Sequence, residues 1–520
     1  MTALHDRLRA LPLARLAGIR RGIEKESLRA LPGGGLALTP HPAALGSALT
    51  HPHITTDYSE SQLELITGVH ATVDDALAQL TEIHQATYRA MGCEPGDEQL
   101  WVGSMPCGLP TDETIPLGRY GSSNVGRAKS VYRMGLGHRY GRRMQTISGI
   151  HYNWSLPGLD NDQHFALIRN FRRHAFVLLY LFGASPAVCA SFVAGREHSL
   201  LPMPGVNASN GTLHMPHGTT LRMGRLGYQS EAQASLNVSC NSLESYANSL
   251  HEALTKPYPA YETVGIRNPG GDYNQLATTL LQIENEFYGL IRPKRVIFPG
   301  ERPLHALRER GVEYIEVRCM DLDPFEPVGI ATPTMRFIDI FLLHCLLADS
   351  PPDTPAEVAA LGRNQHRVAA RGREPGLLLE QGEHTITLTD WARELLDDCV
   401  PIAEALDAAQ GGEANAAALQ AARALVGTPE RLPSARVLQA MQQDFGSSYV
   451  QFIRAQSAAT RRHLLALPWT DAQAARYAAM AAASVAEQQR IEAADTMPFE
   501  QYRLAYLSPE RLQPRRVLQA

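Results

Sequence analysis

Apolar residues recur at helical spacing in several segments of the chain. Thr72-Val-Asp-Asp75 has the sequence of a capping box and opens an amphipathic run that extends to Met91. A second capping box, Thr354-Pro-Ala-Glu357, carries proline in the first turn of the helix that it predicts. The apolar run from Ala175 to Ala184 indicates a buried helical segment. Further helices are predicted at about 162–181, 242–254 and 337–347.

Shorter segments alternate between polar and apolar residues, as half-buried strands do. The predicted strands are Gly22–Leu28, Gln62–Thr67, Thr146–Leu156, Leu281–Phe287 and Tyr314–Cys319. Helices intervene between them without a regular strand–helix–strand alternation. This order favours an α+β fold with a largely antiparallel sheet.

The composition changes after about Arg373. From Cys399 onward the chain is rich in alanine, glutamine and glutamate, and its patterns predict helices at 403–426 and 472–494. No chemistry is evident there, so we interpret 374–520 as an Ala-rich helical part packed on a core formed by 1–373. The alternative for these helices is a solvated arm.

Composition and charge exclude several classes of protein. The chain has 520 residues, of which 44% are hydrophobic, enough for a large core. A net charge of −5 gives no reason to expect a nucleic-acid or membrane partner. The N-terminus lacks the apolar run of a signal peptide. Seven scattered cysteines without a CxxC motif indicate reduced thiols and a cytoplasmic location.

Acidic residues lie on single faces of several predicted strands. Because side chains alternate across a strand, Glu24 shares a face with Glu26, His151 with Asn153, and Glu316 with Arg318. Asp57 precedes an alternating series formed by Glu60, Gln62 and Glu64. A second alternating series, formed by Gln282, Glu284 and Glu286, lies in the predicted strand Leu281–Phe287.

If these strands share a sheet, the clustered carboxylates cannot all ionise without divalent cations. Mg²⁺ and Mn²⁺ prefer oxygen ligands, and this many acids suggest more than one ion. The planar guanidinium of Arg318 suits a phosphate bridging those ions. The pattern therefore indicates phosphoryl-group chemistry.

Each signal also has a structural explanation. Glu24 and Glu26 fit a solvated strand face, His151 fits a satisfied core histidine, and Glu316 with Arg318 fits a structural ion pair. Glu284 and Glu286 fit positions facing water. The stretch 120–129 is rich in glycine and serine, and basic residues follow it as far as Arg143. This region fits either a solvated face or a loop that binds an anionic substrate. It lacks the Walker pattern of phosphate-binding loops.

Long motifs nevertheless resemble one family. GIEKESLR, ALGSALTHPHITTDYSESQLELIT, YGSSNVGRAKSVYRMGLGHRYG, MQTISGIHYNWSLP, LFGASPAVC, LQIENEFYGLIRPKR and EYIEVRCMDLDPF follow one another in this order. They are similar to the gammaproteobacterial type of glutamate–cysteine ligase, from about Leu16 to Arg373 and more loosely beyond. The resemblance implies a glutamine-synthetase-like fold, in which a curved antiparallel sheet forms a funnel, and makes 1–373 the catalytic core.

The resemblance also implies the reaction and its site. ATP would phosphorylate the γ-carboxylate of L-glutamate, and the amine of L-cysteine would then displace phosphate, giving γ-glutamylcysteine, the first step of glutathione biosynthesis. The implied cofactor is Mg²⁺ or Mn²⁺. The implied metal ligands are Glu24, Glu26, Asp57, Glu64, His151 and Glu316. Arg318 would touch the transferring phosphate, Arg133 would stabilise anionic groups, and Asp57 is the candidate base. The implied substrate-binding residues are Arg222, Tyr132, Gln145, Tyr228 and Tyr288.

Some features depart from the family or stay open. The segment 193–219 matches loosely, and we expect no fused glutathione synthetase. We expect a monomer with small-molecule substrates, and the family implies feedback inhibition by glutathione. The alternative functions are a carboxylate–amine ligase with another amine, a phosphotransferase on the same fold, and a non-catalytic metal-binding protein.

Overall fold

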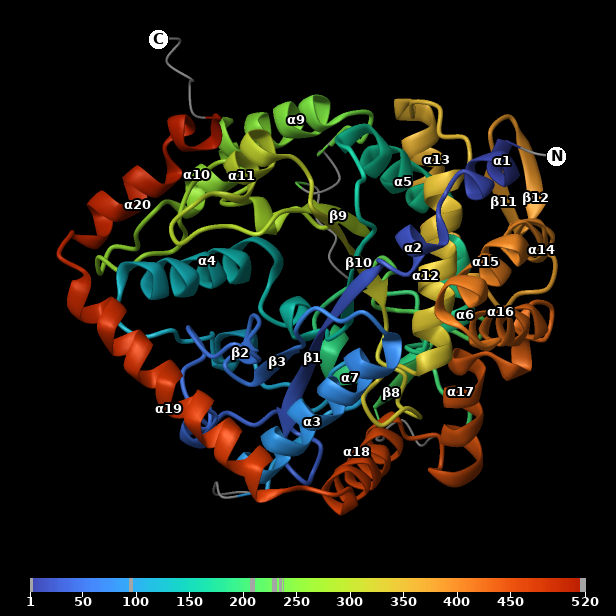
Figure 1. Ribbon diagram of the computed structural model, residues 1–520. Helices are drawn as coiled ribbons and strands as arrows, with labels where there is room; N and C mark the ends of the chain where they lie inside the picture. The colour runs from blue at the N-terminus through green and yellow to red at the C-terminus, as the bar shows by residue number, and fades with distance from the viewer. Residues whose placement is uncertain are drawn as a thin grey trace, which may run out of the picture.

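An antiparallel sheet forms the centre of the protein (Figure 1). The computed structural model describes residues 3–92, 97–205, 211–226, 232, 236 and 238–514. The strand order of the main sheet is β2-β3-β1-β5-β10-β9, with β4 paired to one end of β1. Its strands are β1 Arg20–Ala30, β2 Ile54–Thr56, β3 Gln62–Ile66, β4 Gln99–Leu100, β5 Ile150–Ser155, β9 Ile291–Lys294 and β10 Tyr314–Met320.

Smaller sheets and many helices surround this sheet. The smaller strands are β6 Ala187–Cys189, β7 Leu201–Pro202, β8 Thr212–His214, β11 Leu378–Gln381 and β12 His384–Thr387. The helices before residue 374 are α1 Ala3–Arg9, α2 Leu13–Leu16, α3 Val73–Met91, α4 Asn124–Tyr140, α5 Asn161–His174, α6 Phe176–Phe182, α7 Ala190–Val193, α9 Leu243–Thr255, α10 Pro259–Val264, α11 Pro303–Arg310, α12 Thr332–Leu347 and α13 Pro355–Arg371. Short 3₁₀ turns are η1 Ala43–Leu45, η2 Asp112–Thr114, η3 Met144–Thr146, η5 Glu284–Glu286, η6 Pro429–Arg431 and η7 Pro509–Leu512.

The alternation along the strands buries one face of the sheet in the hydrophobic core. Ile23 of β1, Leu63 of β3 and Tyr152 of β5 are all fully or almost fully buried, and α3 packs against β1 and β3. The polar residues between them therefore point to the opposite face. This alternation places the acidic residues together on one side of the sheet.

Helix α3 begins where the capping box predicts. The hydroxyl of Thr72 accepts a hydrogen bond from the backbone N–H of Asp75 over 3.0 Å, which satisfies one of the free donors in the first turn. Thr72→Ala should lower the free energy of unfolding by about 1 kcal/mol. Thr72→Ser keeps the acceptor and should leave it nearly unchanged. Thermal melting of the three proteins checks this, and equal melting temperatures for Ala and Ser would contradict it.

The C-terminal part is helical, as predicted. It contains α14 Leu388–Asp398, α15 Val400–Gln410, α16 Ala414–Leu425, α17 Pro433–Asp444, α18 Tyr449–Ala466, α19 Asp471–Ala494 and α20 Phe499–Leu507. Leu395 and Leu406 belong to the same buried cluster as Phe341 of α12. Helices α19 and α20 run along the outside of the molecule past α4 (Figure 1). The division at residue 373 stays a prediction.

Several predicted elements were wrong in part. The helix predicted at 162–181 is divided into α5 and α6 at Ala175. The strand predicted at Thr146–Leu156 begins only at Ile150. Leu281–Phe287 is not a strand, because its middle forms the 3₁₀ turn η5. The supposed loop 120–129 is half helical, since Ser123 caps α4 and the helix begins at Asn124.

Among the described residues, no helix combines the length and the hydropathy needed to cross a bilayer. The apolar run predicted to be buried is the short helix α6, whose residues Phe176–Leu181 are buried in the core.

Candidate active site

Strand register brings the predicted acids together. In the antiparallel pairing of β1 with β3, Glu26 lies directly opposite Glu64. On the other side of β1, Glu24 lies directly opposite His151 of β5. Glu316 of β10 lies opposite Asn153 of the same strand β5. Side chains at directly opposed positions are about 5 Å apart at Cβ, so these groups share one polar surface.

His151 lies at the centre of this surface. Its Nδ1 is 3.1 Å from a carboxylate oxygen of Glu24 and 3.9 Å from one of Glu316. Its Nε2 is 3.7 Å from a carboxylate oxygen of Glu26. One donor atom each from Glu24, Glu64 and His151 lies within 4.8 Å of the other two. The prediction that these residues converge agrees with their positions.

The acids of this cluster fall into two groups, one with raised and one with lowered pKa values. Burial, with the nearby charge of Asp57, raises the pKa of Glu26 to about 8. Burial and the charge of Glu24 also raise the pKa of Glu64 well above its usual value. The protein thus supplies too few positive charges for this half of the cluster, and a divalent cation there would restore the ionised carboxylates.

Cations surround the other half of the cluster. Glu316 is 1% exposed and lies 3.1 Å from the Lys294 ammonium and 3.0 Å from the Arg318 guanidinium. Burial opposes its ionisation, but the charges of Lys294 and Arg318 hold the pKa of Glu316 well below its usual value. Glu316 therefore stays ionised and orients Arg318 within the cluster.

These groups line a cavity of about 460 Å³, which we call the acidic cavity. Glu24, Glu26, Asp57, Glu64, His151, Glu316 and Arg318 all line it. Helix α4 contributes Lys129, Tyr132 and Arg133 to the lining of this cavity. Gln145 and Tyr288, which were predicted to bind substrate, also line it. The Arg133 guanidinium donates to the backbone carbonyl of Asp57 and stacks on the Tyr120 ring, 4.6 Å from its centroid.

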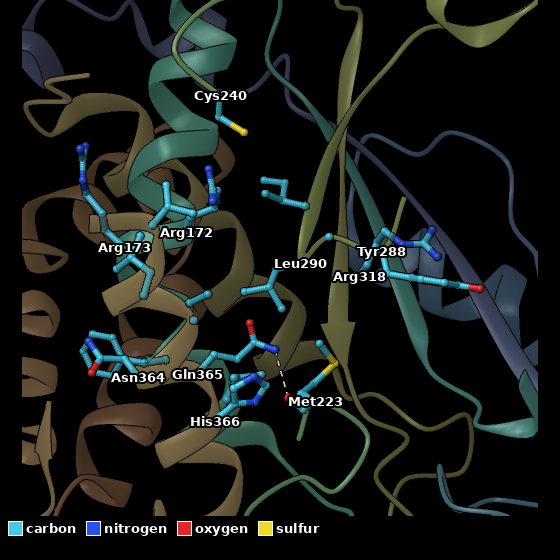
Figure 2. Close-up of a pocket in the computed structure, with 18 of the residues that line it drawn as sticks. Arg172, Arg173, Met223, Cys240, Tyr288, Leu290, Arg318, Asn364, Gln365 and His366 are labelled. Atoms are coloured by element: carbon cyan, nitrogen blue, oxygen red, sulfur yellow. Dashed lines mark hydrogen bonds between the residues drawn. The ribbon is translucent and has the colours of Figure 1, made fainter. Parts of the chain in front are cut away.

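A second cavity of about 380 Å³ shares Arg318 and Tyr288 with the acidic cavity. Figure 2 shows it between these residues on one side and Arg172 and Arg173 of α5 on the other. Arg222 lines this second cavity and not the acidic one. We call it the outer cavity.

Arg222 is held against the backbone of the GIHYNW motif. Its guanidinium donates to the carbonyl of Arg318 over 2.9 Å, and its Nε is buried without a hydrogen-bond partner. A Cβ atom at Gly149 would lie 2.2 Å from this guanidinium, so a larger residue there would displace Arg222 from this position. Arg222 is 3% exposed, so its charge is almost entirely removed from bulk water.

Three of the predicted substrate residues, Tyr132, Gln145 and Tyr288, line the acidic cavity together. Tyr288 donates its hydroxyl proton to the side-chain oxygen of Gln145 over 3.2 Å, and the Gln145 Nε2 has no hydrogen-bond partner. Tyr132 lines the acidic cavity beside them. Tyr228 lies outside the described residues.

The expectation that Glu284 and Glu286 face water was wrong. Neither carboxylate faces water, since the residues are 7% and 0% exposed. Glu284 lies in the wall of the acidic cavity, but Arg302 holds its carboxylate at 2.7 Å. Glu286 accepts from Arg139 and from the Tyr140 hydroxyl, each over 2.8 Å. Both glutamates are structural partners of buried arginines.

Sequence reasoning missed several lining residues. Lys294 alternates with Arg292 in the quoted motif LIRPKR, which could have indicated two cations on one face of an edge strand. Tyr502 and Tyr506 of α20 also line the acidic cavity, with their rings stacked at 5.9 Å. Nothing in the Ala-rich C-terminal sequence indicated a contribution to the site.

The C-terminal arm also supports α4 from outside. The Asp495 carboxylate, just beyond α19, accepts from the backbone and from the side chain of Asn124, the first residue of α4. Asp495→Ala should lower the free energy of unfolding by about 1 kcal/mol, because an anion at a helix N-terminus is lost. Glu487→Ala, at an exposed ion pair on α19, is the matched control. Equal melting temperatures for the two variants would contradict the prediction.

Comparison with known proteins gives a consistent result. Residues 8–368 match the glutamate-cysteine ligase family. The chain is 47% identical to a glutamate–cysteine ligase of Alcanivorax borkumensis, covering 97% of this chain and 98% of that protein. It is 46% identical to one of Saccharophagus degradans, covering 94% of each chain.

Solved structures agree with these sequence relatives. A glutamate–cysteine ligase of Francisella tularensis, solved in complex with AMP, superposes with a TM-score of 0.88 at 34% identity, covering 94% of this chain and 97% of that one. A bifunctional glutathione synthetase of Pasteurella multocida has the same fold, with a TM-score of 0.69 at 24% identity over 92% of this chain and 58% of that one. The predicted α+β, glutamine-synthetase-like fold is thereby confirmed. The chain belongs to the glutamate–cysteine ligase family.

Proposed function

We propose that this protein joins L-cysteine to the γ-carboxylate of L-glutamate at the expense of ATP, giving γ-glutamylcysteine, ADP and phosphate. Membership of the family carries the reaction class. The single structural observation behind it is the convergence of six predicted metal-ligand residues and Arg318 on one cavity. The alternative of another amine acceptor is not favoured by the relatives.

The residues of the acidic cavity fit divalent cations. They offer carboxylate oxygens and one imidazole, which suit Mg²⁺ or Mn²⁺. The raised pKa values of Glu26 and Glu64 mark a shortage of positive charge at the same place. Glu24, Glu26, Asp57, Glu64, His151 and Glu316 would hold these ions, which would reduce the repulsion between carboxylate and phosphate when bound.

The protein's own groups have separate tasks. Arg318, fixed by Glu316, offers a planar fork to the transferred phosphoryl group. Arg133 lies against the loop of Asp57 and adds positive charge where the acyl phosphate forms. Asp57 is our candidate for accepting the proton of the attacking amine.

We assign substrate positioning to residues of both cavities, of which Tyr288 lines the two. Arg222 would hold an anionic oxygen of an amino-acid substrate. Tyr132, Gln145 and Tyr288 would enclose cysteine and keep water from the acyl phosphate, which water would otherwise hydrolyse. Tyr228 is proposed for the same pocket from its sequence motif alone.

Product identification tests this function. The purified protein is incubated with ATP, Mg²⁺, L-glutamate and one of cysteine, 2-aminobutyrate or ammonia, and the products are identified by mass spectrometry. We expect γ-glutamylcysteine and phosphate in equal amounts, with cysteine the best acceptor. Phosphate release that does not depend on cysteine, or a phosphorylated product without ligation, would contradict the proposal.

Other expectations remain predictions. They concern the choice between Mg²⁺ and Mn²⁺, the monomeric state, inhibition by glutathione and the cytoplasmic location. Glutathione inhibition is tested in the same assay by adding glutathione at several glutamate concentrations.

A further inference from the structure

A cluster of nitrogen and sulfur donors lies outside the linings of both cavities, between helices α5, α12 and α14. His174 is the last residue of α5, and His344 and Cys345 lie near the end of α12. One donor atom from each of these three residues lies within 4.8 Å of the other two. None of the three lines the acidic or the outer cavity, so the proposed reaction gives them no role.

The two imidazoles carry donor atoms without partners. His344 is 3% exposed and Cys345 is 0% exposed. The Nδ1 atoms of His174 and His344 are both buried and have no hydrogen-bond partner, and the two rings are 5.5 Å apart. A buried polar atom left unpaired destabilises the folded state, and such atoms are rare in folded proteins. Two of them beside a buried thiol indicate a ligand.

A carboxylate stands behind one of the rings. The Nε2 of His344 lies 3.8 Å from the Asp398 carboxylate, at the end of α14. Metal-bound histidines usually turn their second nitrogen to a carboxylate or carbonyl, which fixes the ring and leaves the first nitrogen for the metal. The Asp398 side chain is 55% exposed, so it also marks a way in from solvent.

We propose that His174, His344 and Cys345 bind one divalent transition-metal ion of the Zn²⁺ type, with Asp398 orienting His344. Two imidazoles and a thiolate suit Zn²⁺ and do not suit Mg²⁺ or Ca²⁺, which prefer oxygen. Zn–N and Zn–S lengths of about 2.0–2.3 Å place tetrahedral donors about 3.5 Å apart. Closing the cluster by about 1 Å through side-chain rotation would complete the site, with water in the fourth position.

The protonation states permit this binding. A neutral imidazole coordinates a metal through its unprotonated nitrogen, and the unpartnered Nδ1 of His174 is available for this. A cysteine thiol ordinarily carries its proton at neutral pH until a metal binds it. Binding forms the metal–sulfur bond and releases that one proton to solvent. The site would connect α5 and α12 to Asp398 of the C-terminal part.

Cobalt spectroscopy tests the proposal. The full-length, reduced protein is titrated with Co²⁺ in excess Mg²⁺, which competes at the oxygen-rich acidic cavity. We expect one tightly bound Co²⁺ per chain, with tetrahedral visible bands and a thiolate-to-cobalt charge-transfer band, both displaced by Zn²⁺. Cys345→Ser should abolish the charge-transfer band. Cys399→Ser, which alters a neighbouring buried cysteine, should retain it. Circular dichroism checks that each variant is folded.

An exposed position provides a second test that does not disturb the core. Asp398→Asn should weaken Zn²⁺ binding about 10- to 100-fold, and Asp397→Asn, its exposed neighbour, should not. A folded wild-type protein without the thiolate band, a band that survives Cys345→Ser, or equal Zn²⁺ affinity for the two aspartate variants would overturn the proposal. Ligase activity with Mg²⁺ is measured separately, so failure of the metal site and failure of the proposed function give different results.

Discussion

Glu316→Gln should reduce the turnover number by about 10²–10³-fold, the loss expected when a preorganised electrostatic contact is removed. Glu316 is buried and contacts Lys294, Arg318 and His151, so it influences both the cation that meets the phosphate and the proposed metal site. Glutamine keeps the size of the side chain but removes its charge. Arg318 would then lose the partner that orients it, and the ions would lose a ligand.

The measurement is the rate of γ-glutamylcysteine formation at saturating ATP, glutamate and cysteine. Glu313→Gln is the matched control, because Glu313 precedes the same strand but pairs with Arg295 near the surface. This control should keep nearly full activity. Circular dichroism of both variants separates lost chemistry from lost folding. A folded Glu316→Gln protein with more than a tenth of normal turnover would remove Glu316 from the site.

Arg318→Lys should reduce turnover by about 10²-fold or more, although the charge is conserved. The Arg318 side chain lines both cavities. One of its guanidinium N–H groups donates a hydrogen bond to the Glu316 carboxylate, which leaves other N–H groups for phosphate oxygens. A lysine ammonium is a point charge, so it cannot bind Glu316 and two phosphate oxygens in one plane.

Separate rate and affinity measurements distinguish this role from a structural one. We expect the turnover number to fall and the KM for glutamate to change little, because the contact matters most in the transition state. Arg295→Lys, at a half-buried ion pair next to the site, is the control and should change neither. A rise in KM with unchanged turnover would show that Arg318 only binds substrate.

The part of the site that lies on regular strands could be predicted from the sequence. Alternation put Glu24 with Glu26 and Glu316 with Arg318 on one face, and the strands do share a sheet. The same alternation misled at Glu284 and Glu286, because a 3₁₀ turn spaces its side chains by other rules and because their arginine partners are distant in sequence. The alternation of side chains along a strand predicts which residues share a face, but it does not identify the residues that pack against that face.

Other parts of the site have no local signal. Tyr502 and Tyr506 reach the acidic cavity only because α19 carries the chain back past α4, which depends on tertiary packing. No proline or glycine lies at the break between α5 and α6 at Ala175, so no local signal in the sequence marks it. The convergence of His174 with His344 and Cys345 likewise depends on how α5 packs against α12.

We propose that acids from distant strands together bind divalent cations around the terminal phosphate of ATP. A crystal structure with Mn²⁺ and a non-hydrolysable ATP analogue tests it most directly, since anomalous scattering locates manganese without reference to the protein. We expect manganese peaks within about 2.5 Å of carboxylate oxygens of Glu24, Glu64 and Glu316, with the terminal phosphate beside Arg318. A nucleotide-bound structure whose manganese peaks lie outside this cluster would contradict the account.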